Sequence, residues 1–291
     1  MNSQDLKISI VTPSFNQGAF LEEALLSVRD QSYPAIEHIV MDGGSTDGSV
    51  EILKRYSSQP GWEHLHWVSE PDGGQGDALN KGFKIATGDV IGWLNSDDRY
   101  RGGCFQTIVK SFAQYPRADV LYGDYTYINE KGRIWRVRRE IEFNRFILLY
   151  LHMLYIPTTS TFFRRRIFEE SNWIDTKYDS AMDYDFILRL FAKGYKFQHI
   201  SELLADFRMH PQSKTVAHPE IGLREHNTIS AEYSPVLRRL RGRFSKKLVL
   251  AGLRLLARTL RYSEKLLRGY YFEQFRPSAL KPSKPIENDL G

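Results

Sequence analysis

Acidic side chains follow apolar stretches at four places in this chain, and they are the residues best placed to do chemistry. The four segments are 41–45 (MDGGS), 69–72 (SEPD), 94–98 (LNSDD) and 182–185 (MDYD). In an open parallel α/β sheet, strand ends face one shared crevice. Carboxylates that converge there suit a divalent metal, a sugar ring and an acid–base step. The pattern therefore points to chemistry on a metal-bound nucleotide sugar.

Asp97 and Asp98 are adjacent and follow the apolar run 90–94. Two neighbouring carboxylates repel each other unless a cation or hydrogen bonds hold them. A hard divalent ion with oxygen ligands would do so, and it would also neutralise a leaving diphosphate. A solvated turn is the plain alternative, because Asn, Ser and Asp all favour turns. Taken alone, this motif leaves both interpretations open.

Two glycine-containing segments follow other predicted strands. Residues 42–49 (DGGSTDGS) are neither a G-x-G-x-x-G dinucleotide fingerprint nor a phosphate loop ending in Gly-Lys-Ser/Thr. Asp42 could accept hydrogen bonds from a base or ribose, whereas Asp47 fits ordinary helix capping better. Residues 70–82 lead through several glycines into a helix, whose free backbone N–H groups can face an anion. Lys81 could assist there or be an ordinary surface lysine.

Asp183 and Asp185 stand at the start of an amphipathic helix. Acidic residues there suit the helix dipole, so a purely structural role is one interpretation. The apolar run that follows indicates that one of the two faces inward, where burial would raise its pKa and make it a usable base. His210 ends another apolar stretch, and its residue type fits either a structural role or a metal ligand.

The elements that must position these residues alternate between strands and helices. Strands are predicted at 7–12, 38–41, 66–69, 90–94 and 120–122, and helices at 20–31, 45–53, 76–86, 105–112 and 183–191. This alternation implies right-handed crossovers and a mostly parallel central sheet with flanking helices. The middle of the chain is less regular, with a hairpin turn predicted at 127–132 and a helix at 146–154.

Three regions are predicted along the chain. Residues 1–234 form the catalytic domain, 235–276 a basic helical extension that begins at Ser234-Pro235, and 277–291 a disordered polar tail. The single Cys104 excludes an intramolecular disulfide and a multi-cysteine zinc site. A polar N-terminus and the absence of a long apolar stretch favour a cytoplasmic location, with contact to a membrane surface left open.

The net charge of +5 is unevenly distributed. Residues 236–262 hold nine Lys or Arg and no acid, so the rest of the chain carries about −4. Leucines of this segment and Phe244 fall near one helical face, and the basic residues fall largely elsewhere. A basic amphipathic helix can lie on an anionic membrane, which would imply a lipid-linked acceptor. Equally, it can pack on the catalytic domain with its basic face in solvent.

Taken in order, these motifs resemble an inverting nucleotide-sugar glycosyltransferase of family 2 with the GT-A fold. The similar segments are 9–16 (SIVTPSFN), 42–49, 76–82 (GDALNKG), 87–98 (TGDVIGWLNSDD), 183–190 (DYDFILRL) and 208–210 (RMH). They cover about residues 7–215 in the order and spacing of the family. Each motif is weak alone, but the ordered set is specific. The resemblance implies a Rossmann-like sheet.

The resemblance also implies roles for individual residues. The residues that would border the nucleotide and the sugar are Pro13, Phe15, Asn16, Asp42, Asp72, Asn80, Lys81, Asn95 and Asp97. Asp97 and Asp98 match the DXD-like motif, with Asp98 expected as the direct Mn²⁺ or Mg²⁺ ligand. His210 matches a position that can approach the metal or the diphosphate. Asp183 matches the catalytic base, which takes a proton from the acceptor hydroxyl.

Two positions depart from the family pattern. Asn95 stands where many members have Asp, so the contact there would be neutral, and Met182 replaces the Glu that usually precedes the base. Neither departure indicates a dead enzyme. The resemblance implies a UDP-sugar as the expected donor and a glycan or lipid-linked glycan as acceptor, as in bacterial surface-polysaccharide synthesis.

Two other classes of function remain open from the sequence. A nucleotidyltransferase also uses a metal and an α/β sheet, but it would transfer a nucleotide instead of releasing a nucleoside diphosphate. A non-enzymatic protein could bind nucleotides or nucleic acid through the basic C-terminal region. The acidic body of the chain argues against nucleic acid as a partner.

Overall fold

Strand β1 (Ile8–Ser14) is buried along its whole length because both faces of the sheet are covered there. In the computed structural model, which describes residues 6–151, 154–240 and 243–272, β1 pairs in parallel with β2 (Ile36–Asp42) and β4 (Val90–Trp93). Strand β3 (Leu65–Ser69) adds to β2, also in parallel. These four strands correspond to four of the strands predicted from the sequence.

The other half of the sheet is mixed. Strand β6 (Val120–Ile128) pairs in parallel with β9 (Phe197–Arg208) and antiparallel with β8 (Thr161–Arg164), which borders β4. The short β5 (Arg99–Tyr100) lies antiparallel to β9, and β7 (Ile134–Arg138) forms the predicted hairpin with β6. The strand order is β3-β2-β1-β4-β8-β6-β9-β5. The parallel arrangement therefore holds for β1–β4 and gives way to mixed pairing beyond β4.

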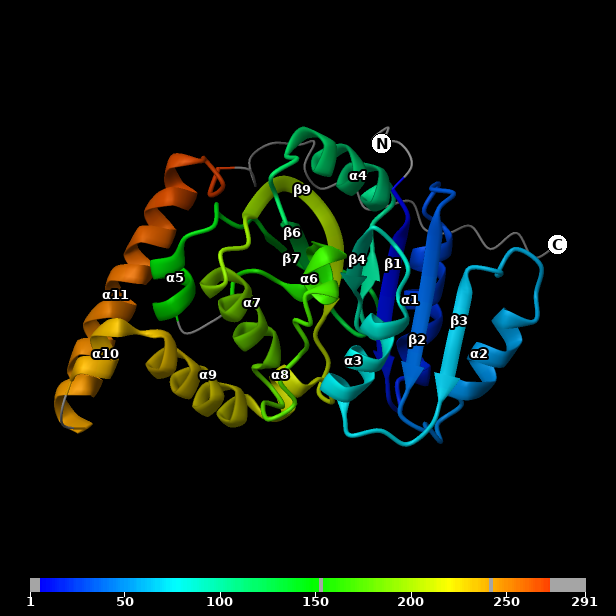
Figure 1. Ribbon diagram of the computed structural model, residues 1–291, viewed down its shortest axis with the longest axis horizontal. Coiled ribbons are helices and arrows are strands. Elements are labelled where there is room, and N and C mark those ends of the chain that lie inside the picture. Colours follow the sequence, from blue (N-terminus) through cyan, green and yellow to red (C-terminus); the bar gives the residue numbers. More distant parts are fainter. Residues whose placement is uncertain (1–5, 152–153, 241–242, 273–291) are drawn as a thin grey trace.

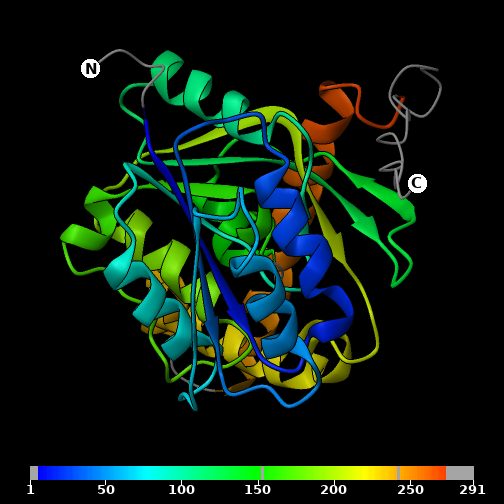
Figure 2. The same ribbon diagram turned by 90° about the vertical axis from the view of Figure 1, so that its right-hand side faces the viewer.

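Helices cover both faces of the sheet (Figure 2), with α1 on one side and α3 on the other. The helices are α1 (Gly18–Arg29), α2 (Ser49–Ser57), α3 (Gln75–Ile85), α4 (Cys104–Gln114), α5 (Arg145–Tyr150), α6 (Arg166–Glu169), α7 (Met182–Ala192), α8 (Lys214–Ala217), α9 (Pro219–Tyr233), α10 (Pro235–Arg239) and α11 (Arg243–Leu267), with a short 3₁₀ turn at Thr158–Ser160. Their order along the chain and their places are visible in Figure 1.

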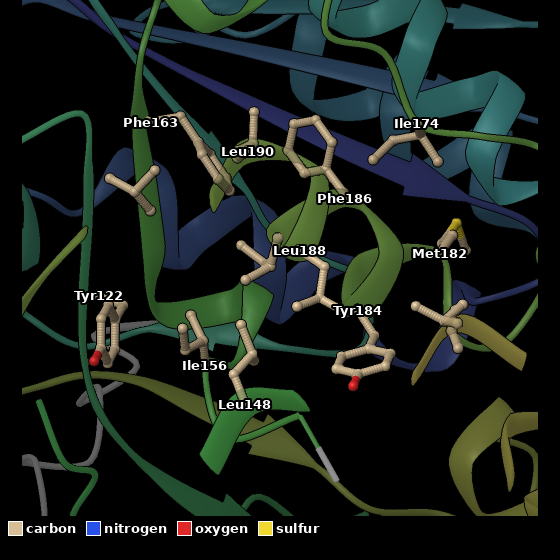
Figure 3. Packing of buried hydrophobic residues seen from close by; sticks show 14 of the residues in the cluster. Tyr122, Leu148, Ile156, Phe163, Ile174, Met182, Tyr184, Phe186, Leu188 and Leu190 are labelled. Atoms are coloured by element: carbon tan, nitrogen blue, oxygen red, sulfur yellow. The ribbon is translucent and has the colours of Figure 1, made fainter. Parts of the chain in front are cut away.

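Alternate residues of β1 enter two different cores, as the period of a strand requires. Val11 joins the larger core with α3, α5 and α7, while Ile8 and Ile10 join the core under α1 and α4. Figure 3 shows part of the larger core, where Phe186 and Leu190 of α7 lie near Phe163 of β8. Helix α7 is thereby fixed against the sheet, and so is the acidic motif at its start.

Glycine at position 82 lets α3 lie close to the sheet. A Cβ on Gly82 would come within 2.4 Å of a Val11 methyl carbon, so a larger residue would push the helix away. Helix α3 begins directly after the glycine-rich loop at 72–76. Its close packing on β1 and β2 therefore holds that loop over the carboxyl ends of the parallel strands.

The C-terminal helical region is divided in two. The hydroxyl oxygen of Ser234 accepts a hydrogen bond from the backbone N–H of Leu237 (3.1 Å), as expected for the predicted helix start. Helix α10 then ends at Arg239, because Leu240 is extended, and α11 begins at Arg243. Helix α11 packs against α5, and its Ala257 is fully buried in the larger core. The predicted tail at 277–291 and the side chain of Phe244 lie outside the described part of the chain.

Candidate active site

A cavity of about 610 Å³ lies at the carboxyl ends of β1, β2 and β4. It is also bordered by the start of α3, the start of α7 and the segment after β9. The predicted residues that line it are Pro13, Phe15, Asp72, Asn95, Asp97 and Asp183. Those of the predicted set that do not line it are Asn16, Asp42, Asn80, Lys81, Asp98 and His210. Segments far apart in the sequence thus meet at one cavity, as the four acidic motifs predicted.

Asp97 is the carboxylate of the adjacent pair that reaches the cavity. Its Oδ2 lies 3.0 Å from Nε2 of His210, which is buried directly behind it. The His210 ring packs at 4.7 Å between ring centres against Phe20 of α1. The imidazole is therefore held in place behind the carboxylate, and of the two residues only Asp97 lines the cavity.

Asp98 points the other way and is almost completely buried. Its carboxylate accepts hydrogen bonds from the Thr159 hydroxyl (2.5 Å) and the Arg208 backbone N–H (2.8 Å). Burial raises its pKa well above the usual range, and the charge of Asp97 adds to that rise. Successive residues of this turn face opposite sides. Asp97 therefore faces the cavity, whereas Asp98, which the resemblance led us to expect as the direct metal ligand, does not line it.

The hydrogen bonds of Asn95 explain why the first position of the 95–98 motif carries a neutral side chain. Its Oδ1 accepts hydrogen bonds from Trp93 Nε1 (2.8 Å) and Gln75 Nε2 (3.0 Å). Its amide nitrogen donates to Asp98 (3.3 Å). A carboxylate at position 95 could not make that donation and would place a third negative charge beside two others. The amide thus stabilises the buried Asp98 and holds Gln75 at the cavity.

Asp183 lies in the first turn of α7 and is partly exposed to the cavity. Burial raises its pKa to about 6, and the charge of Glu225 adds to the rise. A hydrogen bond from the Tyr184 backbone N–H (2.7 Å) acts in the opposite direction. Asp185, the other acid of the motif, pairs with Arg189 (2.6 Å) away from the cavity. Of the two, Asp183 is therefore the one placed to accept a proton from a bound molecule.

Glu225 of α9 fixes the turn that leads into Asp183. Its carboxylate accepts hydrogen bonds from the backbone N–H groups of Asp179 (3.0 Å), Ser180 (2.8 Å) and Ala181 (2.8 Å). These N–H groups lie just before α7, where no residue of the helix itself could accept from them. The acid therefore holds the turn and places a negative charge near Asp183.

Four predicted residues build the loops around the cavity instead of lining it. Asp42 is buried and accepts hydrogen bonds from the hydroxyls of Ser45 (2.6 Å) and Ser69 (2.7 Å). Asn16 joins the loops after β1 and β2, because its Oδ1 accepts from the Thr46 backbone N–H (2.9 Å). Both residues thus organise the wall on which a nucleotide would lie.

The other two are tied to neighbouring segments. Asn80 makes paired hydrogen bonds with the backbone of Ile174 (2.8 and 2.9 Å), so it holds the segment that leads to α7. Lys81 forms ion pairs with Glu70 (3.1 Å) and Asp77 (3.3 Å) beside the glycine-rich loop. Neither side chain lines the cavity, so in this structure both residues hold neighbouring segments in place.

Several cavity residues were not predicted. Lys214 and Asp179 both line the cavity and form an ion pair that joins the segment after β9 to the segment before α7. Gln75, Thr158 and Phe207 also reach the cavity. Gln75 lies at the start of α3, in the glycine-rich segment 70–82, and the other four lie in the second half of the fold, where no spacing in the sequence distinguishes them from surface residues.

The residues present fit a divalent metal only in part. Within the described ranges, no group of three or more His, Cys, Asp or Glu gathers closely enough to hold a metal by itself. Asp97 offers a carboxylate oxygen of the type that Mn²⁺ and Mg²⁺ accept, and the His210 imidazole lies behind it with Nε2 at 3.0 Å from that carboxylate. Since a metal in a nucleotide site commonly takes further ligands from phosphate and water, two protein donors are compatible with such a site.

Known proteins with similar sequences and folds agree with this arrangement. The sequence model described as Glycosyl transferase family 2 matches residues 9–171. An uncharacterized glycosyltransferase of Mycobacterium tuberculosis is 34% identical over 184 residues, which are 62% of this chain and 68% of that protein. Hyaluronan synthase of Pasteurella multocida is 24% identical over 221 residues, which are 76% of this chain but 22% of the synthase.

Two solved structures share the fold. Staphylococcus aureus TarS 1–349 in complex with UDP-GlcNAc has a TM-score of 0.64 at 19% identity, covering 85% of this chain and 71% of that one. The mannosyltransferase PcManGT from Pyrobaculum calidifontis, in complex with GDP-Man and Mn²⁺, has a TM-score of 0.56 at 16% identity, covering 94% and 88%. The chain is thus a glycosyltransferase with the GT-A fold, and it belongs to glycosyl transferase family 2.

Proposed function

We propose that this enzyme transfers a sugar from a nucleoside-diphosphate sugar to an acceptor hydroxyl with inversion at the anomeric carbon. The observation that carries the proposal is the shared cavity of Asp97, backed by His210, and Asp183, whose pKa is raised to about 6. Asp97 and His210 suit a metal ion at the diphosphate of the donor. The carboxylate of Asp183 suits a general base near neutral pH.

The donor would lie along the ends of β1, β2 and β4. Phe15 is 60% exposed at the cavity wall and offers a flat apolar surface to a nucleobase. Gly43 lies against the Asp72 carboxylate, where a Cβ would come within 3.0 Å of Oδ2, so the two loops meet closely behind the nucleotide. A UDP-sugar is our expected donor, and the TarS complex with UDP-GlcNAc supports that choice.

Asp97 and His210 would hold Mn²⁺ or Mg²⁺. Such an ion supplies neutralisation of the negative charge on the leaving diphosphate. The Mn²⁺ in the PcManGT complex, a structure with the same fold, supports a role for a divalent metal.

The protein's own chemistry is one in-line displacement. Asp183 accepts the proton of the acceptor hydroxyl while that oxygen bonds to the anomeric carbon and the bond to the diphosphate oxygen breaks. Because attack and departure occur on opposite faces, an α-linked donor gives a β-linked product. The proton ends on Asp183 and the bonding pair ends on the released nucleoside diphosphate.

The acceptor we propose is a glycan or a lipid-linked glycan in bacterial surface-polysaccharide synthesis. The similarity to hyaluronan synthase supports a sugar hydroxyl as nucleophile. We propose a cytoplasmic enzyme that works at the inner face of the cell membrane. A lipid-linked acceptor would require a surface of the protein that meets that membrane.

Two measurements on the full chain test the donor and the reaction type. A thermal-shift screen of UDP-, GDP- and TDP-sugars with and without Mn²⁺ should raise the melting temperature for one nucleotide class only when metal is present. Turnover of that donor should then release a nucleoside diphosphate. Release of pyrophosphate would identify a nucleotidyltransferase instead, and no metal-dependent shift with any donor would contradict the proposed donor site.

A further inference from the structure

Helix α11 turns part of its basic face toward the rest of the protein, although the sequence led us to expect that face in solvent or on a membrane. Its inward side carries Arg261 and Lys265, which pair with the fully buried Glu140 of the segment after β7 (2.5 and 3.4 Å). Arg254, also inward, hydrogen-bonds with Asn227 of α9. A buried carboxylate is costly without a partner, so these pairs fix the rotation of the helix. Part of the basic face is therefore used inside the protein.

The consequence is an apolar surface on the outside, which we call the α11 outer face. Its members are Leu248, Leu255, Leu256, Leu260, Tyr262, Leu266 and Leu267. Leu248 and Leu255 are each 66% exposed and Leu267 is 87% exposed. Leu248, Leu255 and Leu266 recur at whole helical turns and so form one continuous stripe. Tyr271 and Phe272 extend the exposed apolar surface past the end of the helix.

The charges beside this face have one sign. Lys246, Lys247 and Arg258 are exposed on α11, and Arg238 and Arg239 are exposed on α10. Among residues 235–240 and 243–272 the one acidic residue is Glu264, which pairs with Arg268. In a contact between two copies of this face, like charges would be brought together. An anionic surface would be complementary to them.

We propose that the α11 outer face binds an anionic lipid bilayer in the plane of its surface. Leucines that enter the region below the headgroups, with basic residues at their edge, are the arrangement by which an amphipathic helix lies on a membrane. Aromatic residues such as Tyr262 and Tyr271 favour the same interfacial depth. None of the helices in the described part of the chain is long and apolar enough to cross a bilayer.

The position of α11 connects this surface to the active site. Lys214 and Thr215 of α8 line the cavity, α8 contacts α9, α9 contacts α10, and α10 contacts α11. In Figure 1 these four helices follow one another along the lower left of the molecule. Helix α11 is therefore joined to the cavity wall through a continuous series of packed helices.

Vesicle cosedimentation of the full-length protein tests this. Vesicles contain phosphatidylcholine with about 30 mol % phosphatidylglycerol, or phosphatidylcholine alone. The test variant carries Leu248→Gln, Leu255→Gln, Leu266→Gln and Leu267→Gln, since Gln keeps a helix propensity close to that of Leu. The matched control carries Ile85→Gln and Leu223→Gln, two exposed apolar residues on α3 and α9. A third variant, with Lys246→Gln, Lys247→Gln and Arg258→Gln, tests the charges.

The wild type and the matched control should bind the anionic vesicles, and the leucine variant should bind at least about tenfold less. The wild type should bind anionic vesicles more strongly than phosphatidylcholine vesicles, and the charge variant should lose most of this preference. Absence of wild-type binding, or equal binding by the leucine variant, would overturn the proposal. A dimer seen by light scattering that only the leucine variant dissociates would assign the face to a second copy. Metal-dependent nucleotide binding is measured on the same proteins, so a failure here is separate from a failure of glycosyl transfer.

Discussion

At the scale of single residues, the proposed role of Asp183 as the base predicts the pH range in which the enzyme works. A base must be deprotonated, and burial raises the pKa of Asp183 to about 6 by disfavouring the charged carboxylate. We therefore expect turnover of the donor to fall as the pH drops through about 6 and to level off above it. Nucleoside diphosphate release from pH 4.5 to 8 measures this, and an acid limb near pH 4, typical of a solvated Asp, would contradict it.

Glu225 offers a second prediction at this scale. Glu225→Gln removes a negative charge whose presence raises the pKa of Asp183, while the amide oxygen can still accept from part of the turn. The acid limb of the turnover profile should therefore move to lower pH. Glu220→Gln, an exposed acid on the same helix, is the matched control and should leave the profile in place. A purely structural role would lower turnover at every pH without moving the limb.

Residue types and order predict which segments form the site, but not which atoms face the ligand. Asp97, Asp183 and Phe15 lie at the cavity as expected, because each follows directly on a strand or starts a helix. The side chain of Asp98 points away from the cavity, and its direction is set by Thr159 of the 3₁₀ turn and Arg208 of β9. Such partners are far away in the sequence and leave no local pattern.

At the scale of elements, β1–β4 could be predicted from the sequence, whereas in the second half β6, its hairpin with β7, and α7 could be predicted but β8 and β9 could not. Strands β1–β4 are short apolar runs separated by helices with a regular apolar period, so pattern and structure agree there. Buried and exposed residues do not alternate regularly along β9. Its pairing with β6 shifts register near Gly123 and Asp124. A curved strand exposes and buries residues irregularly, which removes the periodic signal.

The rotation of α11 also follows from pairing that the sequence does not display. We expect Glu140→Gln to destabilise the protein by about 3–5 kcal/mol, because Arg138, Arg261 and Lys265 would lose the buried charge that compensates them. Glu142→Gln, at a half-exposed acid in the same segment, should cost only about 0–1 kcal/mol. Urea unfolding of the two variants measures the difference, and equal midpoints would contradict this role for Glu140.

At the scale of the whole molecule, the acidic body and the basic C-terminal region are not separate units of charge. Glu140 pairs with Arg261 and Lys265 of α11, Glu142 pairs with Arg268 just after that helix, and Ala257 of α11 is buried in the larger core. The helix therefore combines two functions in one segment: an inner side that holds the domain together and an outer side that is apolar. Substitutions on the outer side leave the inner side intact, which makes them a cleaner probe than truncation.

The most direct test of the central claim compares Asp183→Asn with the wild type in the presence of Mn²⁺ and the donor found by the thermal-shift screen. The amide cannot take the acceptor proton, so turnover should fall by about 10²–10⁴-fold. The metal-dependent thermal shift caused by the donor should persist, because in this proposal Asp97 and His210, and not Asp183, hold the metal and the diphosphate. Wild-type turnover in Asp183→Asn would contradict the assignment of Asp183 as the base and the mechanism built on it.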